Sequence, residues 1–186
     1  TVHELLDVFP GEAIRLALLK THYRKPLDFT NDGILEAKRE LDGYYGVLQR
    51  VSKIKPITPG TEDSRTAWAL QDDLNTPSAL SYLRSRSKLL NKLPVENTEA
   101  LAEEKGQLLD AANLLGLLQQ DPEDWFKWQP PGTESLDDAA IDALIAERNG
   151  ARADKDFARA DEIRDDLASK GVLLEDDAQG TIWKRG

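Results

Sequence analysis

Charged and aromatic residues near the end of the sequence are the strongest candidates for a recognition site. One aromatic residue, Phe157, lies close in sequence to four cations: Arg152, Lys155, Arg159 and Arg164. The carboxylates of Asp161 and Asp176 could accept hydrogen bonds from base amino or imino groups. Stacking, phosphate binding and base-edge hydrogen bonds are the interactions that recognition of single-stranded RNA requires. The alternative is that Phe157 anchors the core of a small domain.

Two polar segments earlier in the chain could also carry chemistry, although neither forms a complete catalytic set. Asp72 and Asp73 could ligate a metal ion, but adjacent carboxylates ahead of a helix more often stabilise its N-terminus electrostatically. His22, beside Tyr23 and Arg24, could act as an acid or base or contact a phosphate. The alternative is a polar loop at the edge of a helical bundle. The sequence contains no glycine-rich phosphate loop and no Ser-His-Asp candidate set.

The composition restricts the chemistry further. The 186 residues include no cysteine and only two histidines, which excludes disulfides, thiolate zinc sites, a cysteine nucleophile and a multi-histidine metal site. The net charge is −10, with residues 1–60 nearly neutral and the rest acidic. A protein that binds nucleic acid by charge alone is basic over a whole face, so binding here would depend on local basic clusters. The alternative is an acidic surface that maintains solubility.

The spacing of apolar residues predicts helices through residues 1–120. A short helix is predicted over residues 12–20, and a long helix begins near Thr30. Its buried stripe is expected to contain Ile34, Ala37, Leu41, Tyr44, Leu48 and Val51. Thr76 is expected to cap the next helix, with Pro77 at the first helical position, and another should run from about Thr98 to Gln119. Three long amphipathic helices with short connections predict an antiparallel bundle.

The helix that follows Thr76 should bury Leu80 and Leu83 and expose a row of cations: Arg84, Arg86, Lys88 and Lys92. Exposed cations on one helix are candidates for contacts with a phosphate backbone. Of these, Arg84, Arg86 and Lys88 are the predicted contacts.

A passage rich in proline and tryptophan interrupts the helical pattern. Residues 121–134 include Pro130-Pro131-Gly132, which cannot continue a helix. This passage predicts a linker between a bundle domain, residues 1–120, and a small domain, residues 135–186.

The small domain should contain two helices and a hairpin. Ser135, with Asp138 three residues later, predicts the start of the first helix. A second helix should open at Asp156, bury Phe157 with other apolar residues, and end at Gly171. Two β-like runs around a turn at residues 177–180 predict the hairpin.

Four segments carry a specific combination of motifs. They are Gly11-Glu12-Ala13-Ile14-Arg15, followed by Leu18-Leu19; His22-Tyr23-Arg24-Lys25-Pro26-Leu27-Asp28-Phe29; Asp72-Asp73-Leu74-Asn75-Thr76-Pro77; and Ile141 to Arg185. In this order they resemble the C-terminal half of bacterial cysteinyl-tRNA synthetase, a class I aminoacyl-tRNA synthetase. The resemblance covers essentially the whole chain.

The resemblance implies a fold and a set of site residues. The fold would be mainly α, an antiparallel bundle of the class I anticodon-binding type followed by a small α/β anticodon-recognition domain. The family's C-terminal domain recognises the GCA anticodon of tRNA-Cys, and its bundle supports the inner side of the tRNA. The implied anticodon contacts are Arg152, Phe157, Asp161, Arg164 and Asp176. Phe157 stands where the family form has Trp, so a smaller ring would stack on the base.

The resemblance also implies what the chain lacks. The family binds ATP and zinc through motifs that are absent here, so both are expected in an N-terminal part, and this chain alone is expected to be inactive. Thr1 and the lack of methionine suggest a piece of a longer polypeptide. The parent reaction would be ATP-dependent cysteinylation of tRNA-Cys in the cytoplasm. The expected partner is tRNA-Cys, with neither membrane nor DNA, and the chain is expected to be monomeric.

Two other functions remain as alternatives. A related cysteine ligase of thiol-cofactor biosynthesis would share the catalytic fold, but its small-molecule acceptor needs no anticodon reader. A helical protein–protein adaptor would show no preference among RNAs.

Overall fold

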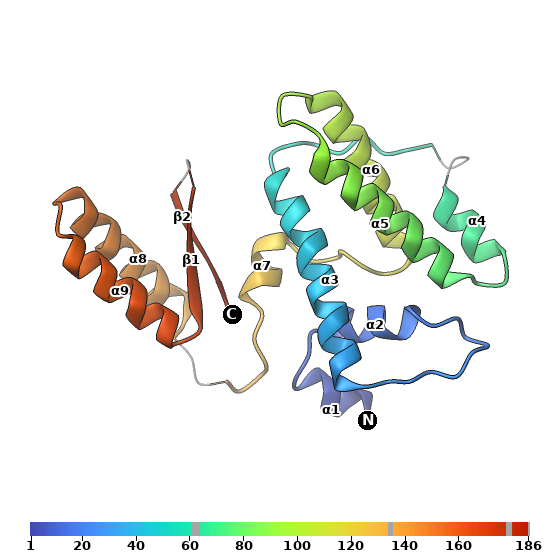
Figure 1. Ribbon diagram of the computed structural model, residues 1–186, viewed down its shortest axis with the longest axis horizontal. Coiled ribbons are helices and arrows are strands. Elements are labelled where there is room, and N and C mark those ends of the chain that lie inside the picture. Colours follow the sequence, from blue (N-terminus) through green and yellow to red (C-terminus); the bar gives the residue numbers. More distant parts are fainter. Residues whose placement is uncertain (61–63, 134–135, 178–179, 186) are drawn as a thin grey trace. The chain divides into compact units, whose positions relative to one another are not determined.

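The computed structural model describes residues 1–60, 64–133, 136–177 and 180–185, and the chain divides into two compact units (Figure 1). The first unit spans Thr1–Trp125 and the second Phe126–Gly186. Helices make up the described secondary structure of the first unit, whereas the second combines helices with a two-stranded sheet. The prediction of a helical bundle followed by a small α/β unit is confirmed.

The helices of the first unit vary widely in length. They are α1 (Val2–Leu6), α2 (Gly11–Leu19), α3 (Asn31–Arg50), α4 (Arg65–Gln71), α5 (Thr76–Lys92), α6 (Thr98–Leu114) and α7 (Pro122–Lys127), which crosses the division between the units. The short helices α1, α4 and α7 were not predicted, because five to seven residues give too few turns for a periodic apolar pattern. Helix α7 falls in the passage that was expected to be a linker.

The core of the first unit lies among the long helices. Helix α2 packs on α3, and α5 packs on α6 and contacts α3. All six apolar residues predicted for the stripe of α3 are buried, as are Leu80 and Leu83 of α5 and Leu101 and Leu108 of α6. Among the described residues, no helix is long and apolar enough to span a membrane.

Two helix boundaries differ from the prediction. The side chain of Asn75, not Thr76, caps α5 by accepting a hydrogen bond from the backbone N–H of Ser78 at 3.1 Å, and Thr76 is the first helical residue. Helix α6 ends at Leu114 rather than Gln119, because Gly116 is left-handed with φ of 64° and the Leu117 N–H donates back to the Ala112 carbonyl at 2.9 Å. Beyond this turn, the backbone N–H groups of Leu118 and Gln119 donate to the buried Glu12 carboxylate, each at 2.9 Å. A distant acceptor therefore replaces the helical carbonyls.

The second unit consists of α8 (Asp138–Ala153), α9 (Phe157–Ser169), β1 (Val172–Asp177) and β2 (Gly180–Arg185). The strands pair antiparallel, in a register that joins Val172 to Arg185 and Asp176 to Thr181. The predicted hairpin is confirmed, although Ala178 and Gln179 of its turn lie outside the described residues. The core consists of Ile141, Ile145, Ile163, Leu167, Val172 and Trp183.

Short polar side chains set the helix ends of this unit. Asp137 caps α8 through the backbone N–H of Ala140 at 2.6 Å, while the predicted start at Ser135 lies outside the described residues. Asp156 caps α9. Lys155 adopts a left-handed conformation with φ of 63°, which allows the chain to reverse between α8 and α9. As predicted, α9 is followed by Gly171, with φ of 76°.

Candidate nucleic-acid interface

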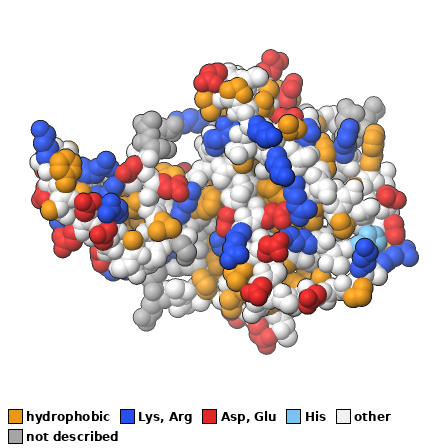
Figure 2. All heavy atoms as spheres, in the orientation of Figure 1, with side chains coloured by type: hydrophobic (Ala, Val, Ile, Leu, Met, Phe, Trp, Pro, Cys, Tyr) orange, Lys and Arg blue, Asp and Glu red, His pale blue; other side chains and the backbone are white. Residues whose placement is uncertain are grey.

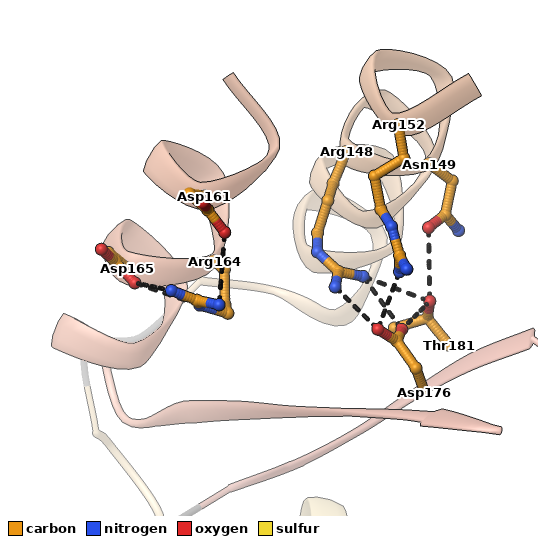
Figure 3. Close-up of polar contacts among 8 residues, drawn as sticks. All are labelled: Arg148, Asn149, Arg152, Asp161, Arg164, Asp165, Asp176 and Thr181. Atoms are coloured by element: carbon orange, nitrogen blue, oxygen red, sulfur yellow. Dashed lines mark hydrogen bonds and ion pairs between the residues drawn. The ribbon is translucent and has the colours of Figure 1, made fainter. Parts of the chain in front are cut away.

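The carboxylate of Asp176 is the centre of a polar cluster in the second unit (Figure 3). Arg148 donates hydrogen bonds to it from both terminal nitrogens, Nη1 to Oδ1 at 3.0 Å and Nη2 to Oδ2 at 2.8 Å. Arg152 donates from Nη1 to Oδ2 at 2.8 Å, and the Thr181 hydroxyl donates to Oδ1 at 2.7 Å. The structure thus brings together Arg152 and Asp176, two of the predicted site residues.

Regular secondary structure explains why these side chains converge. Arg148 and Arg152 are four residues apart on α8 and therefore share one helix face. Asp176 and Thr181 are directly opposite each other in the hairpin, so their side chains project from the same side of the sheet. Because the hairpin packs with α8 and α9 around one core, the helix face and the strand pair meet.

The two arginines of this cluster differ in exposure. The Arg148 side chain is only 8% exposed, whereas that of Arg152 is 47% exposed. Hydrogen bonds from Arg148, and next from Thr181, hold the pKa of the Asp176 carboxyl far below its ordinary value. The hydrogen bond to Asp176 in turn raises the pKa of Arg148. The carboxylate therefore remains a charged acceptor at neutral pH.

This pairing predicts an acid-sensitive second unit. A carboxylate with a lowered folded-state pKa stabilises the fold above its unfolded pKa of about 4, and this contribution is lost as the pH falls below that value. Between pH 6 and pH 3, Asp176 should account for a loss of about 1 kcal/mol, since its partly exposed position screens the pairing. Urea unfolding at both pH values, followed by the Trp183 indole NMR signal, measures this loss.

The Asp176→Asn variant should lose less stability on acidification than wild type. Asp165→Asn is the matched control, because the ion pair of this exposed carboxylate within the described residues is with Arg164. An equal acid response in wild type and Asp176→Asn would contradict the prediction.

Three further predicted site residues share one face of α9. Phe157, Asp161 and Arg164 follow a spacing of four and three residues, which places them along the same side of a helix. Arg164 forms ion pairs with Asp161 at 3.2 Å and Asp165 at 3.1 Å. The charge of Asp161 also raises the pKa of Arg148, which connects this face electrostatically to the Asp176 cluster.

The expectation that Phe157 is buried is wrong. Phe157 as a residue is 63% exposed, while the aromatic residue in the described core of this unit is Trp183. Phe157 is the first residue of α9, where its ring lies beyond the apolar stripe formed by Ala160, Ile163 and Leu167. The structure therefore removes the core-anchor alternative and leaves an aromatic ring accessible for stacking.

The predicted exposure of two cations on α5 is also wrong. Arg84 forms an ion pair with Glu40 of α3 at 2.6 Å, and Arg86 pairs with Glu104 of α6 at 3.2 Å; both arginines are partly buried. Lys88 is exposed, and its side chain has no hydrogen bond or ion pair within the described part of the chain. Acidic residues interleave with basic ones over much of the visible surface, as Figure 2 shows.

The two polar segments of the first unit, one around His22 and the other around Asp73, contact each other. Tyr23 donates from its hydroxyl to Asp73 Oδ1 at 2.6 Å, and Arg24 Nε lies 2.9 Å from Asp73 Oδ2. The His22 ring stacks on Tyr23 with centroids 4.9 Å apart. Asp73 is thus engaged by a loop 50 residues away, and the described residues hold no group of acidic or histidine side chains placed to bind a metal ion.

Arg148 and Thr181 are members of the site that the sequence analysis missed. Arg148 stands one helical turn before Arg152, so helical spacing from a predicted site residue was a usable signal. Thr181 follows from the hairpin register, which aligns it with Asp176.

Two family descriptions match this chain. Residues 137–183 match the cysteinyl-tRNA ligase anticodon binding domain, and residues 67–119 match the DALR domain. The first match contains every site residue of the second unit described above.

Curated relatives match along the whole chain. The cysteine–tRNA ligase of Rhodospirillum centenum is 50% identical over 185 residues, which cover 100% of this chain and 39% of the relative. The enzyme so named from Paramagnetospirillum magneticum is 50% identical over 190 residues, covering 100% of this chain and 40% of the relative. That of Xanthomonas oryzae pv. oryzae is 45% identical over 200 residues, covering 100% and 41%.

The chain thus spans about 40% of the length of these relatives. Both matched domains, and relatives that are 50% identical along the whole chain, lead to one assignment. The chain belongs to the cysteinyl-tRNA synthetase family and corresponds to a C-terminal part of its members.

Proposed function

We propose that the chain binds tRNA-Cys and reads its anticodon as part of a cysteine–tRNA ligase. The observation that carries this proposal is the exposed Phe157 ring on the same helix face as Asp161 and Arg164. An aromatic ring beside cations and carboxylates supplies the interactions with which proteins recognise unpaired RNA bases. In this proposal, residues 1–120 form the supporting bundle, 121–134 the linker and 135–186 the recognition domain.

Each site residue has a distinct role in the proposal. Phe157 stacks on an anticodon base, and the carboxylates of Asp161 and Asp176 accept hydrogen bonds from base edges. Arg152 and Arg164, whose side chains are about half exposed, bind phosphates or base edges. Of the three predicted phosphate contacts on α5, Lys88 has no ion pair within the described part of the chain and can meet a phosphate, whereas Arg84 and Arg86 would first have to leave their carboxylate partners.

The chemistry of the whole ligase lies outside this chain in the proposal. The parent protein attaches cysteine to tRNA-Cys with ATP in the cytoplasm, and ATP and zinc bind in its N-terminal part. This chain supplies tRNA recognition and acts as a monomer. A thiol-cofactor ligase would gain nothing from an exposed base-stacking residue, because its acceptor is a small molecule.

Replacing Phe157 with alanine tests the proposed function. Loss of the ring should weaken binding of tRNA-Cys by about 1–3 kcal/mol, or roughly 5- to 150-fold, with little dependence on base identity, because every base has a face on which to stack. The measurement is a fluorescence anisotropy titration of the 186-residue chain with tRNA-Cys and with an anticodon-substituted tRNA. Phe157→Trp should preserve or strengthen binding.

Leu173→Ala serves as the matched control. Leu173 is also an exposed apolar residue of the second unit, on β1, and it has no role in the proposed interface. Its removal should leave both affinities unchanged. Equal binding by wild type and Phe157→Ala would contradict the stacking role. Failure of the wild type to prefer tRNA-Cys would contradict anticodon recognition itself.

A further inference from the structure

The Asp176 carboxylate has no vacant acceptor position in this structure. A carboxylate offers about four lone-pair sites to hydrogen-bond donors. Four donors already reach Asp176: Nη1 and Nη2 of Arg148, Nη1 of Arg152 and Oγ1 of Thr181. If Asp176 accepts a hydrogen bond from an anticodon base, one of these donors must therefore leave.

Arg148 is the partner least able to leave. Its side chain is 8% exposed, and its Nε is buried without a hydrogen-bond partner among the described residues. Both terminal nitrogens already depend on Asp176. Withdrawal from the carboxylate would leave a buried cation without its counter-charge, which is among the most costly changes in a protein interior.

Arg152 is the partner most able to leave. It makes one hydrogen bond to Asp176, at 2.8 Å, and its side chain is 47% exposed, so water or an RNA phosphate can replace the carboxylate. The Thr181 hydroxyl is an intermediate case. It belongs to the paired hairpin and lies 3.3 Å from Asn149 Oδ1, so its position is fixed from two sides.

We propose that RNA binding replaces Arg152 on Asp176 with a base N–H, while Arg148 holds the carboxylate in place as a positioning residue for anticodon specificity. The inference rests on the proposed function. The exchange preserves the Arg148–Asp176 pair and frees one cation at the surface where the RNA phosphates approach. One event thus supplies a base-specific acceptor and a phosphate-binding cation, two requirements that a permanently bound Arg152 would leave unmet.

The roles of the two arginines predict different defects. Removal of Arg148 leaves Asp176 without its fork, so its carboxylate loses a fixed orientation toward the base. Removal of Arg152 leaves the carboxylate oriented but deletes a phosphate contact. Arg148→Gln should therefore reduce discrimination between anticodons, whereas Arg152→Gln should weaken binding of every RNA to a similar degree.

The test measures a ratio: the dissociation constant of an anticodon-substituted RNA divided by that of the RNA with the GCA anticodon. The probes are an anticodon stem-loop with GCA and the same stem-loop with one anticodon base substituted, titrated against the full 186-residue chain at one salt concentration. Arg148→Gln and Asp176→Asn should each lower the ratio about tenfold or more. The double variant should lower it no further, because Arg148 acts through Asp176. Arg152→Gln should lower both affinities and leave the ratio unchanged.

Two further variants separate specificity from folding. Lys170→Gln removes the same charge from a lysine that pairs with Asp166 in the same unit, and the ratio should stay at the wild-type value. Arg148→Lys keeps a buried cation but cannot form the two-nitrogen fork, so it should show an intermediate ratio. Thermal unfolding of each variant reports its stability separately.

Four results would overturn the inference. An unchanged ratio in Arg148→Gln or Arg148→Lys would leave Arg148 with a structural role only, whatever the loss of stability. Additive effects of Arg148→Gln and Asp176→Asn would mean that Arg148 contacts the RNA itself. A collapsed ratio in Arg152→Gln would make Arg152 the base reader. A wild-type chain that does not distinguish the two stem-loops would instead contradict the proposed function, together with the exchange that depends on it.

Discussion

Replacing Glu12 with alanine should lower the free energy of unfolding of the first unit by about 3–5 kcal/mol. The buried Glu12 carboxylate accepts hydrogen bonds from the backbone N–H groups of Leu118 and Gln119, each at 2.9 Å, and from the Tyr45 hydroxyl at 3.0 Å. Alanine would leave these donors without their acceptor. A buried donor left unpaired costs about 1–3 kcal/mol. The donors of Leu118 and Tyr45 are buried, whereas the N–H of exposed Gln119 can reach water, so the expected loss lies within the range of about 2–6 kcal/mol that two buried donors give.

Urea unfolding followed by Trp125 fluorescence measures this effect directly. The Trp125 ring stacks on Tyr45 with centroids 4.6 Å apart and a 16° angle between their planes, so its signal reports on the Glu12 network. Glu36→Ala is the matched control, because the interaction of this exposed glutamate in the described part of the chain is a surface ion pair with Lys20, so its loss should change stability by less than about 1 kcal/mol. A loss below about 1 kcal/mol for Glu12→Ala would contradict the structural role.

The end of α6 shows one limit of the sequence analysis. Periodicity predicted the buried stripe of α3, because that stripe extends over many turns and depends on local spacing alone. The end of α6 could not be found in this way. The helix ends at left-handed Gly116, a local signal that the continuing apolar pattern outweighed in the prediction. The N–H groups that follow depend on an acceptor, Glu12, that is more than 100 residues away along the chain. The apolar pattern continues through Leu115 and Leu118, which are buried although they lie beyond the helix.

The candidate site shows the same division between local and distant information. Phe157, Asp161 and Arg164 were predicted from the resemblance, and their spacing of four and three residues alone places them on one face of α9. The four hydrogen bonds to the Asp176 carboxylate depend on the hairpin register and on packing against α8, which no local pattern encodes. The prediction that Arg84 and Arg86 of α5 are exposed failed for a similar reason, because their carboxylate partners lie on other helices.

Gly106 illustrates a case in which local preference and tertiary contact have opposite consequences. It lies inside α6, where intrinsic helix propensity favours alanine over glycine by about 1 kcal/mol. A Cβ at this position, however, would stand 1.7 Å from the backbone oxygen of Ile57 and 2.7 Å from its carbonyl carbon. The Ile57 N–H donates to the Ala102 carbonyl at 2.9 Å, so this backbone segment is attached to the same helix.

Gly106→Ala should therefore destabilise the first unit by about 3 kcal/mol or more, because the clash involves backbone atoms rather than the flexible end of a side chain. Gly43→Ala in α3 is the matched control, since a Cβ there meets no atom within 4 Å and should stabilise by up to about 1 kcal/mol. Both variants restrict the unfolded chain equally, so the difference between their unfolding free energies isolates the contact with Ile57. Urea unfolding of the two variants under one condition gives that difference. A stabilised Gly106→Ala would mean that the segment around Ile57 can move away from α6 at little cost, and that the close approach of Ile57 does not contribute to the stability of the bundle.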